Sequence, residues 1–264
     1  MSSEVPQPEE IFARTKEEGR HRLERPLTEL VSTAIAAGVD VVFGITAIGV
    51  ASLAFAGRFG PDVGHFVGSL FFGIAFVFIV VGRSELFTEN FLVPVAGLER
   101  TRRSWLKLVE LWTVSPVFNL LGGMAMILVL TTHGVLPDGT GTPIMDLALK
   151  LDQNGFLAAF MSAVAAGALI TMMTWLVEGQ PSMGVRVAVA WMTGALVALG
   201  AFNHVIVVTL EMFYGIRFGS HVGWGDLFAN MGTATLGNMF GGLVFVTLNR
   251  ANQARGARSG HSAA

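Results

Sequence analysis

The chain has 264 residues, of which 52% are hydrophobic and only 14% are charged, and its mean hydropathy is +0.61. Because soluble domains carry about 25% charged residues, this composition indicates a protein that crosses a membrane several times. The net charge of −2 excludes a strongly basic nucleic-acid-binding protein, so no nucleic-acid partner is expected. The lack of cysteine excludes disulfides, thiolate metal sites and a catalytic thiol.

The two ends of the chain are polar. Residues 1–26 mix acidic and basic side chains and have no apolar core near the start, so they are not expected to be a cleavable signal peptide. Residues 251–264 are largely Ala, Arg, Gly and Ser, a composition typical of disorder. We therefore expect a cytoplasmic N-terminal segment over 1–26, a membrane domain over 27–250, and a disordered cytoplasmic tail over 251–264.

The membrane domain contains six apolar runs that can span a bilayer, for which a helix needs about 20 residues. Polar residues interrupt the second and the fifth run. Glycines recur at spacings that let helices approach closely in lipid, so most of them are expected to serve packing. The six predicted spans are Leu27–Ala56, His65–Leu98, Leu106–Thr131, Phe156–Val177, Val185–Phe213 and Leu227–Leu248.

The distribution of Lys and Arg predicts the orientation of these spans. With the N-terminus in the cytoplasm, the cytoplasmic segments carry thirteen of the 17 basic residues and the outer loops carry Arg58, Lys150 and Arg217. Only Arg83 remains within a span. Because cytoplasmic loops carry an excess of Lys and Arg, we expect a multi-pass protein of the inner (plasma) membrane with both termini in the cytoplasm.

The two interrupted spans occupy corresponding places in the two halves of the chain. Three spans per half make the halves enter the membrane from opposite sides, as in a 3+3 inverted repeat. A helix broken inside a membrane exposes free N–H groups and a positive dipole end, which is tolerated only in a protein interior or a cavity. The pattern predicts an all-α transporter or channel whose pathway passes the two breaks and attracts a small anion.

The first break, Arg83–Asn90, contains Leu86, Phe87 and Thr88. The Thr88 hydroxyl could donate a hydrogen bond to an anion, or it could bond back to a helical carbonyl, as threonines in membrane helices often do. Leu86 and Phe87 could close the pathway or simply fill the core.

The second break, Phe202–His204, contains the only histidine inside a span. An imidazole can exchange a proton near neutral pH, although a lone membrane histidine can equally be a hydrogen-bond partner between helices. The place of His204, mirrored against Thr88 in the first half, favours a role in the pathway. Glu211, further along this span, is expected at the outer membrane interface. The remaining histidines are not spaced for a metal site, and none is predicted.

Charged side chains inside a membrane are costly, and Arg83, Glu85 and Glu89 flank the first break. They could form an ion-pair network on the cytoplasmic side that holds the broken helix, with Glu178 or Glu110 as further partners of Arg83. Alternatively, they could line a charged entry vestibule.

Four motifs stand in the second, third, fifth and sixth spans. They are Gly82-Arg83-Ser84-Glu85-Leu86-Phe87-Thr88, Val117-Phe118-Asn119-Leu120-Leu121-Gly122, Phe202-Asn203-His204 and Thr235-Leu236-Gly237-Asn238-Met239-Phe240-Gly241-Gly242. Together they resemble the motifs of the formate/nitrite transporter family, and the resemblance covers roughly residues 20–250. The combination is specific, whereas each motif alone is weak.

The resemblance implies a homopentamer in the lipid bilayer, in which every six-helix protomer has an aquaporin-like fold and its own pore. Members of this family pass small monovalent anions such as formate, nitrite, hydrosulfide or lactate, often with proton coupling. By the resemblance, Leu86, Phe87 and Thr88 form the loop that faces the central histidine, which is His204.

The resemblance also implies two pore constrictions and an outer vestibule. Phe72 matches one aromatic constriction, and Val197 stands near the second, where the family more often has a phenylalanine. Lys150 lies within about one residue of a vestibule lysine of the family.

Several positions depart from the family pattern. Asn203 replaces a glutamate beside the histidine, so His204 loses a neighbouring carboxylate. Val208 and Gly167 stand where asparagine is common, and the charges of Arg83 and Glu89 are added at the first break. These differences predict a less polar pore around His204 and a different charge at one mouth.

The sequence therefore predicts a membrane channel or transporter for small monovalent anions or their weak acids, with His204 relaying a proton or orienting the anion. A channel for a small neutral solute and a non-conducting scaffold remain as alternatives. No enzyme and no cofactor are predicted, because the chain shows no metal cluster, no nucleophile with a base at usable spacing and no phosphate-binding loop.

Overall fold

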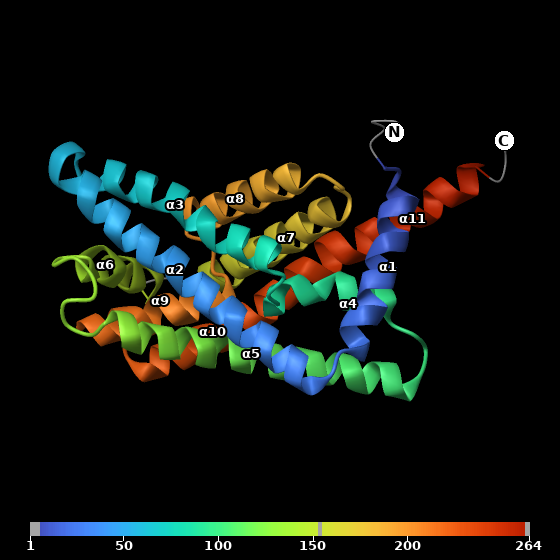
Figure 1. The fold of residues 1–264 in the computed structure, drawn as a ribbon, viewed down its shortest axis with the longest axis horizontal. Helices are drawn as coiled ribbons and strands as arrows, with labels where there is room; N and C mark the ends of the chain where they lie inside the picture. Colours follow the sequence, from blue (N-terminus) through green and yellow to red (C-terminus); the bar gives the residue numbers. More distant parts are fainter. Residues whose placement is uncertain (1–5, 153–154, 262–264) are drawn as a thin grey trace.

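The computed structural model describes residues 6–152 and 155–261, which are helical apart from short connections (Figure 1). Most helices run along the long axis of the molecule, whereas α1 (Pro8–Glu24) lies across one end (Figure 1). We call this the α1 end. The opposite end, where α6 (Gly141–Asp152) lies, is the α6 end.

Within the described residues, five helices are long and apolar enough to cross a membrane, and each overlaps a predicted span. Four of them are single α-helices, and the fifth is a continuous run, Trp224–Ala257, which contains the predicted span Leu227–Leu248. That run consists of α10 (Trp224–Phe240), a π-helical segment η2 (Gly241–Thr247) and the start of α11 (Leu248–His261). The four are α2 (Leu27–Phe59), α3 (Pro61–Gly82), α5 (Arg102–Leu130) and α7 (Phe156–Glu178).

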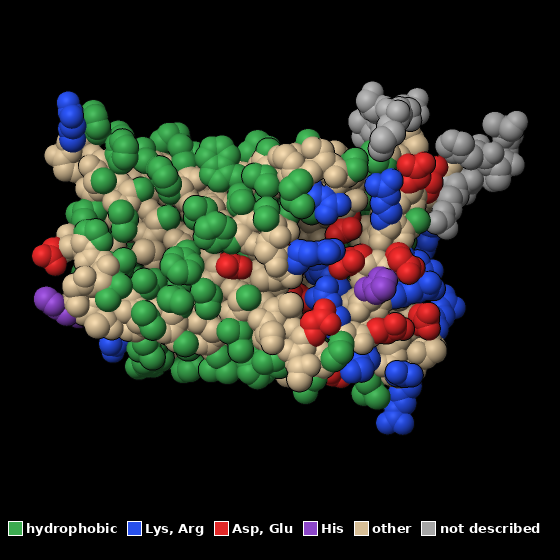
Figure 2. Space-filling model, viewed as in Figure 1, with side chains coloured by type: hydrophobic (Ala, Val, Ile, Leu, Met, Phe, Trp, Pro, Cys, Tyr) green, Lys and Arg blue, Asp and Glu red, His purple; other side chains and the backbone are tan. Residues whose placement is uncertain are grey.

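The surface agrees with a membrane protein. Hydrophobic side chains cover the middle of the molecule, while Lys, Arg, Asp and Glu gather at the α1 end (Figure 2). Large apolar side chains such as Phe71 and Leu236 are more than half exposed. Exposing so wide an apolar surface to water is unfavourable, whereas contact with lipid is not.

Both interrupted spans are broken helices in the structure. After α3 the chain forms a short 3-10 segment, η1 (Phe87–Phe91), and then α4 (Val93–Gly97). The predicted fifth span consists of two shorter helices, α8 (Met183–Leu199) and α9 (Val205–Phe218). Each break contains a non-glycine residue with positive φ, Arg83 at 55° and Ala201 at 46°, and no other described non-glycine residue has one.

An asparagine on α5 holds the first break. Asn119 Oδ1 accepts from the Phe87 backbone N–H at 2.9 Å. Its Nδ2 donates to the Glu85 carbonyl at 2.9 Å and to the Ala34 carbonyl of α2 at 2.8 Å. One buried side chain therefore satisfies backbone groups that the interruption of the helix would leave unpaired.

An asparagine on α10 holds the second break in the same way. Asn238 Oδ1 accepts from the Val205 backbone N–H at 2.9 Å. Its Nδ2 donates to the Asn203 carbonyl at 3.0 Å and to the Ala163 carbonyl of α7 at 2.7 Å. The two hydrogen-bond patterns correspond residue for residue, as a repeat of the two halves predicts, and Leu86 is the counterpart of His204.

Glycines let these asparagines come close to the first helix of each half. A Cβ atom at Gly38 of α2 would collide with the Asn119 carbonyl oxygen, and one at Gly167 of α7 with that of Asn238. Close packing against Asn238 therefore explains why this chain has glycine at position 167, where the family that it resembles commonly has asparagine.

The expected disordered tail over residues 251–264 is wrong for its described part. Residues 251–261 continue α11, which packs against α1, and Ala254 is only 2% exposed. The helix forms because this contact buries one of its faces. Residues 262–264 lie outside the described part of the chain.

We predict that Gly38→Ala destabilises the protein, whereas Gly57→Ala on the same helix does not. Alanine normally favours a helix over glycine by about 1 kcal/mol. At Gly38 the new methyl group meets a backbone carbonyl, and overpacking of this kind costs about 1–3 kcal/mol. At Gly57 it meets nothing within 4 Å. Thermal unfolding in detergent compares the two variants, and equal midpoints would contradict this account of the packing.

Candidate functional site

Thr88 and His204 meet where the two broken helices approach each other. Thr88 lies in η1, and His204 caps the N-terminus of α9. Thr88 Oγ1 lies 2.6 Å from His204 Nε2, and both residues are fully buried. The structure thus brings together two residues that the sequence placed in the pathway, through a polar contact between the two halves of the chain.

The other ring nitrogen of His204 determines which group donates in this pair. The Val207 backbone N–H donates to His204 Nδ1 at 3.2 Å. A nitrogen that accepts carries no proton, so the neutral ring carries its proton on Nε2 and donates it to Thr88 Oγ1. The Thr88 hydroxyl proton is then available to a solute. A proton on Nδ1 would point at the N–H of Val207, and two donors facing each other repel. The geometry therefore favours the neutral imidazole.

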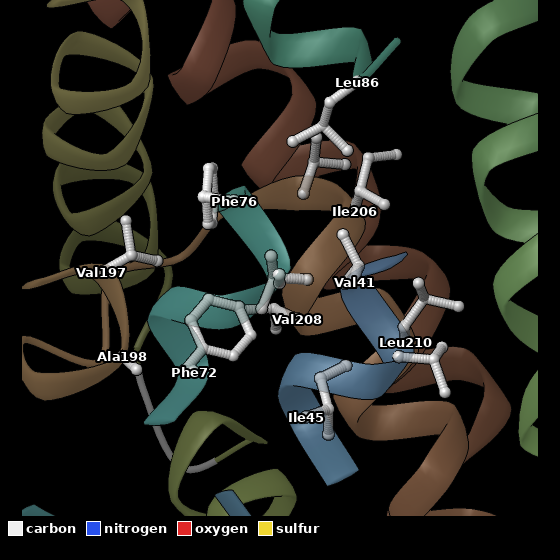
Figure 3. Packing of buried hydrophobic residues seen from close by; sticks show 14 of the residues in the cluster. Val41, Ile45, Phe72, Phe76, Leu86, Val197, Ala198, Ile206, Val208 and Leu210 are labelled. Atoms are coloured by element: carbon white, nitrogen blue, oxygen red, sulfur yellow. The ribbon is translucent and has the colours of Figure 1, made fainter. Parts of the chain in front are cut away.

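Apolar side chains surround this pair. The ring of Phe76 lies edge-on to that of His204, with centroids 6.3 Å apart, and to that of Phe72, with centroids 5.9 Å apart. Val197 faces the same region from α8 (Figure 3). These apolar residues are all at most 2% exposed, so the centre of the helical bundle is closed in this structure.

The backbone N–H groups at the two breaks are already engaged. Those of Leu86, Phe87, Val205 and Val207 all donate to side chains of the protein. The expectation of free N–H donors is therefore wrong for these four residues. The positive dipole end of α9 still points at the Thr88–His204 pair, because His204 is the N-cap of α9.

Asn203 supports the loop and does not contact the imidazole. It forms a reciprocal amide pair with Asn230 of α10, with N–O distances of 2.8 and 3.1 Å. Its Nδ2 also donates to the Ala159 carbonyl at 3.2 Å. Asn203 is 4% exposed, and these bonds satisfy its amide without a charge.

Residues at the end of α1 hold the charge of Glu85. This carboxylate is 1% exposed, pairs with Arg25 and accepts from Asn90 Nδ2 at 2.8 Å. Arg22 donates to Asn90 Oδ1 at 3.1 Å. Burial lowers the pKa of Arg22, but the carboxylates of Glu85 and other nearby residues together raise it by more. The net effect is a raised pKa, so this guanidinium stays charged. The α1 segment is thereby tied to the first break.

A cavity of about 370 Å³ lies beside this network at the α1 end. Glu85 and Glu89 belong to its lining, as do Arg22 and Arg25. Glu85 therefore takes part in an ion pair and also lines this cavity, as each of the two predicted alternatives requires.

Arg83 has a different place from Glu85. It ends α3 in a left-handed conformation, is exposed, and forms no ion pair with any described carboxylate. Arg83 belongs to the cavity lining and acts electrostatically on Glu178, so both alternatives for Arg83 stay predictions.

Lys150 lies away from the closed centre. It is an exposed residue in the last turn of α6, near enough to His65 of α3 to act on it electrostatically. The structure therefore places Lys150 at the α6 end and not against the Thr88–His204 pair.

Sequence reasoning missed the roles of several residues. Asn119 and Asn238 belong to the motifs, but their hydrogen bonds to the backbone of the two breaks were not predicted. A lone amide side chain in an apolar span is a signal that could have indicated this role. Nothing in the sequence distinguished Arg22 and Arg25 from the other basic residues of the first 26 positions.

We predict that Arg25→Ala lowers the free energy of unfolding by about 3 kcal/mol, because the variant leaves the buried Glu85 carboxylate without its cation. The matched control is Arg83→Ala, which removes an exposed guanidinium and should leave the unfolding midpoint unchanged. The double variant Arg25→Ala/Glu85→Gln should recover much of the loss. Thermal unfolding in detergent measures all three, and a larger effect of Arg83→Ala would reverse the assignment.

Comparison with known proteins agrees with the resemblance seen in the sequence. A family model described as formate/nitrite transporter matches residues 9–251. The inner membrane protein YfdC of Escherichia coli K12 is 26% identical over 247 residues, covering 91% of this chain and 77% of the relative. A probable formate transporter of Methanothermobacter thermautotrophicus is 29% identical, covering 84% of this chain and 87% of the relative.

Solved structures share the fold. A pentameric formate channel with formate bound has a TM-score of 0.71 at 23% identity and covers 84% of this chain and 94% of that chain. A channel described as an FNT family ion channel has a TM-score of 0.73 at 20% identity and covers 92% and 96%. The family model covers nearly the whole chain, and the chain belongs to the formate/nitrite transporter family.

Proposed function

We propose that this chain forms a membrane channel or transporter for small monovalent anions or their weak acids, with formate and nitrite as the first candidates. The observation that carries the proposal is the Thr88–His204 pair, buried between apolar walls at the meeting point of two broken helices. The chain has no role as an enzyme and needs no cofactor in this proposal.

The pair can present one hydrogen-bond donor to a passing solute. Because His204 Nε2 donates to Thr88 Oγ1, the hydroxyl proton of Thr88 points away from the ring. The dipole of α9 adds partial positive charge at the same place. Both features favour a small anion, or a neutral acid that accepts a hydrogen bond through its carbonyl oxygen.

The apolar walls set the energetic barrier. Phe72, Phe76 and Val197 offer no polar atoms, so a bare ion would lose several kcal/mol of hydration on passing them. Protonation of the anion to its neutral acid removes most of that cost. Because its imidazole is neutral, His204 orients the solute in this scheme and does not supply the proton that converts the anion to its neutral acid.

Similar proteins support the substrate class. A probable formate transporter of Methanothermobacter thermautotrophicus is 29% identical, and the nitrite transporter NirC of Escherichia coli K12 is 26% identical over 234 residues. By analogy with the pentameric formate channel of the same fold, the chain forms a homopentamer with one pathway per protomer.

The charges suggest the orientation. Basic residues gather at the α1 end (Figure 2), so this end faces the cytoplasm of an inner (plasma) membrane and the α6 end faces outward. The predicted six spans then correspond to the five long apolar helices plus α8 and α9 counted together.

We predict that Thr88→Val lowers uptake of formate or nitrite by about 10- to 100-fold, because a hydrogen bond to a charged group is worth about 1.5–3 kcal/mol. Thr88→Ser keeps the hydroxyl and should retain most of the uptake. Initial rates in proteoliposomes measure both, with size-exclusion elution as the check on assembly. Loss of uptake in Thr88→Ser with uptake retained in Thr88→Val would mean that the methyl packing matters and the hydroxyl does not.

A substrate panel at two pH values tests the function itself. Uptake of formate, nitrite, hydrosulfide, acetate or lactate that rises at acidic pH is expected. Osmotic water permeability without acid uptake would support a channel for neutral solutes. No flux of any solute would support a scaffold.

A further inference from the structure

Glu211 is a buried carboxyl group that the pathway described above does not use. It lies on α9 between His204 and the α6 end and is 4% exposed. It makes no hydrogen bond or ion pair with any described residue. Protein encloses this carboxyl group, and its depth in the membrane stays a prediction. A buried carboxylate without a partner is costly, so this position favours the protonated acid.

Glu211 shares a helix face with His204. Residues at spacings of three, four and seven lie on one side of an α-helix, which aligns His204, Val207 and Glu211. Seven residues correspond to about 10 Å along the axis. Glu211 thus lies on the same side of α9 as His204, about two turns closer to the α6 end. At this distance the two side chains cannot exchange a proton directly.

A small cavity connects Glu211 with the constriction. Its volume is about 10 Å³, and its lining includes Glu211, Val197, Phe202 and Val207. That is about the space that one water molecule needs. Val197 is the residue predicted at the second constriction, so the carboxyl group lies beside the narrow part of the pathway.

The charged surroundings of Glu211 are sparse. His65 of α3 is the other titratable residue in the cavity lining, and no Lys or Arg belongs to the described lining. Lys150 and Asp62 act electrostatically on His65. The half of α5 that packs on α9 carries no charged residue, and neither does α2 from Val41 to Gly57. Among the side chains that the structure describes, the charged residues of α6 and α10 are exposed, and they are Asp146, Lys150 and Asp226.

We propose that Glu211 is the proton donor for a small weak-acid anion that enters from the α6 end, an inference that rests on the proposed function. The O–H bond of the Glu211 carboxyl breaks, and a new O–H bond forms on the anion. The products are the neutral acid and the Glu211 carboxylate. The neutral acid crosses the apolar walls, and the carboxylate recovers a proton from water at the α6 end, with His65 of the same cavity lining as a relay.

This assignment gives the chain a proton donor that the central pair lacks. His204 is fixed as a neutral imidazole by the cap of α9, and Asn203 carries no proton to give. Glu211 in its ionised form repels an anion that arrives at the neighbouring constriction. Uptake from the α6 side therefore falls as pH rises and Glu211 loses its proton.

The test compares Glu211→Gln with Glu211→Asp in proteoliposomes. Glutamine keeps the shape of the side chain but cannot donate an acidic proton, whereas aspartate keeps the carboxyl group. Initial rates of labelled formate uptake are measured from pH 5 to 8. We expect Glu211→Gln to lose about 10-fold or more of the rate at acidic pH and to flatten the pH profile, and Glu211→Asp to keep a falling profile.

A second measurement covers the case in which Glu211→Gln fails to assemble. Infrared difference spectra of the unmodified protein should show a protonated carboxyl band that weakens when formate is added and shifts in Glu211→Asp. A parental pH profile in Glu211→Gln, or no carboxyl band that responds to formate, would overturn the proposal. Absence of flux in the unmodified protein would instead overturn the proposed function.

Discussion

The structure depends on how a helix can be interrupted inside a membrane. An unpaired backbone N–H or C=O group in hydrocarbon costs several kcal/mol, so a break must be satisfied by the protein itself. Asn119 and Asn238 do this, each with one acceptor and two donor contacts to a break and to the first helix of its half. Positions 38 and 167 require glycine, because a Cβ atom there would collide with the backbone carbonyl of Asn119 or Asn238.

The position of the candidate site follows from these two clamps. Each fixes the loop that carries a functional side chain, and the internal symmetry brings the two loops together. Thr88 and His204 then meet at 2.6 Å without any direct contact between the asparagines. The symmetry is not kept in the charges, because Glu85 is held by Arg25 of the N-terminal segment whereas its counterpart Asn203 is held by the neutral Asn230.

The sequence predicted what local composition determines. Apolar runs with polar interruptions indicated the spans, both breaks and the importance of Thr88 and His204. It did not predict contacts between distant residues of common type, such as Arg25 with Glu85, because several basic residues were equivalent candidates. The helical course of residues 251–261 was also missed, since it depends on packing of α11 against α1 and not on propensity. The burial of Glu211 was not predicted, because its distance along the span says little about which face is buried.

The most direct test of the account is whether a solute in the pathway reaches Thr88. The chain has no cysteine, so Thr88→Cys introduces a single thiol. The account predicts that a small methylating thiosulfonate reagent modifies it in membranes and that formate or nitrite slows the reaction. Thr209→Cys, equally buried on α9 but off the face of His204, should resist modification. Equal reactivity at the two positions, or no protection by either anion, would contradict a pathway past Thr88 and His204.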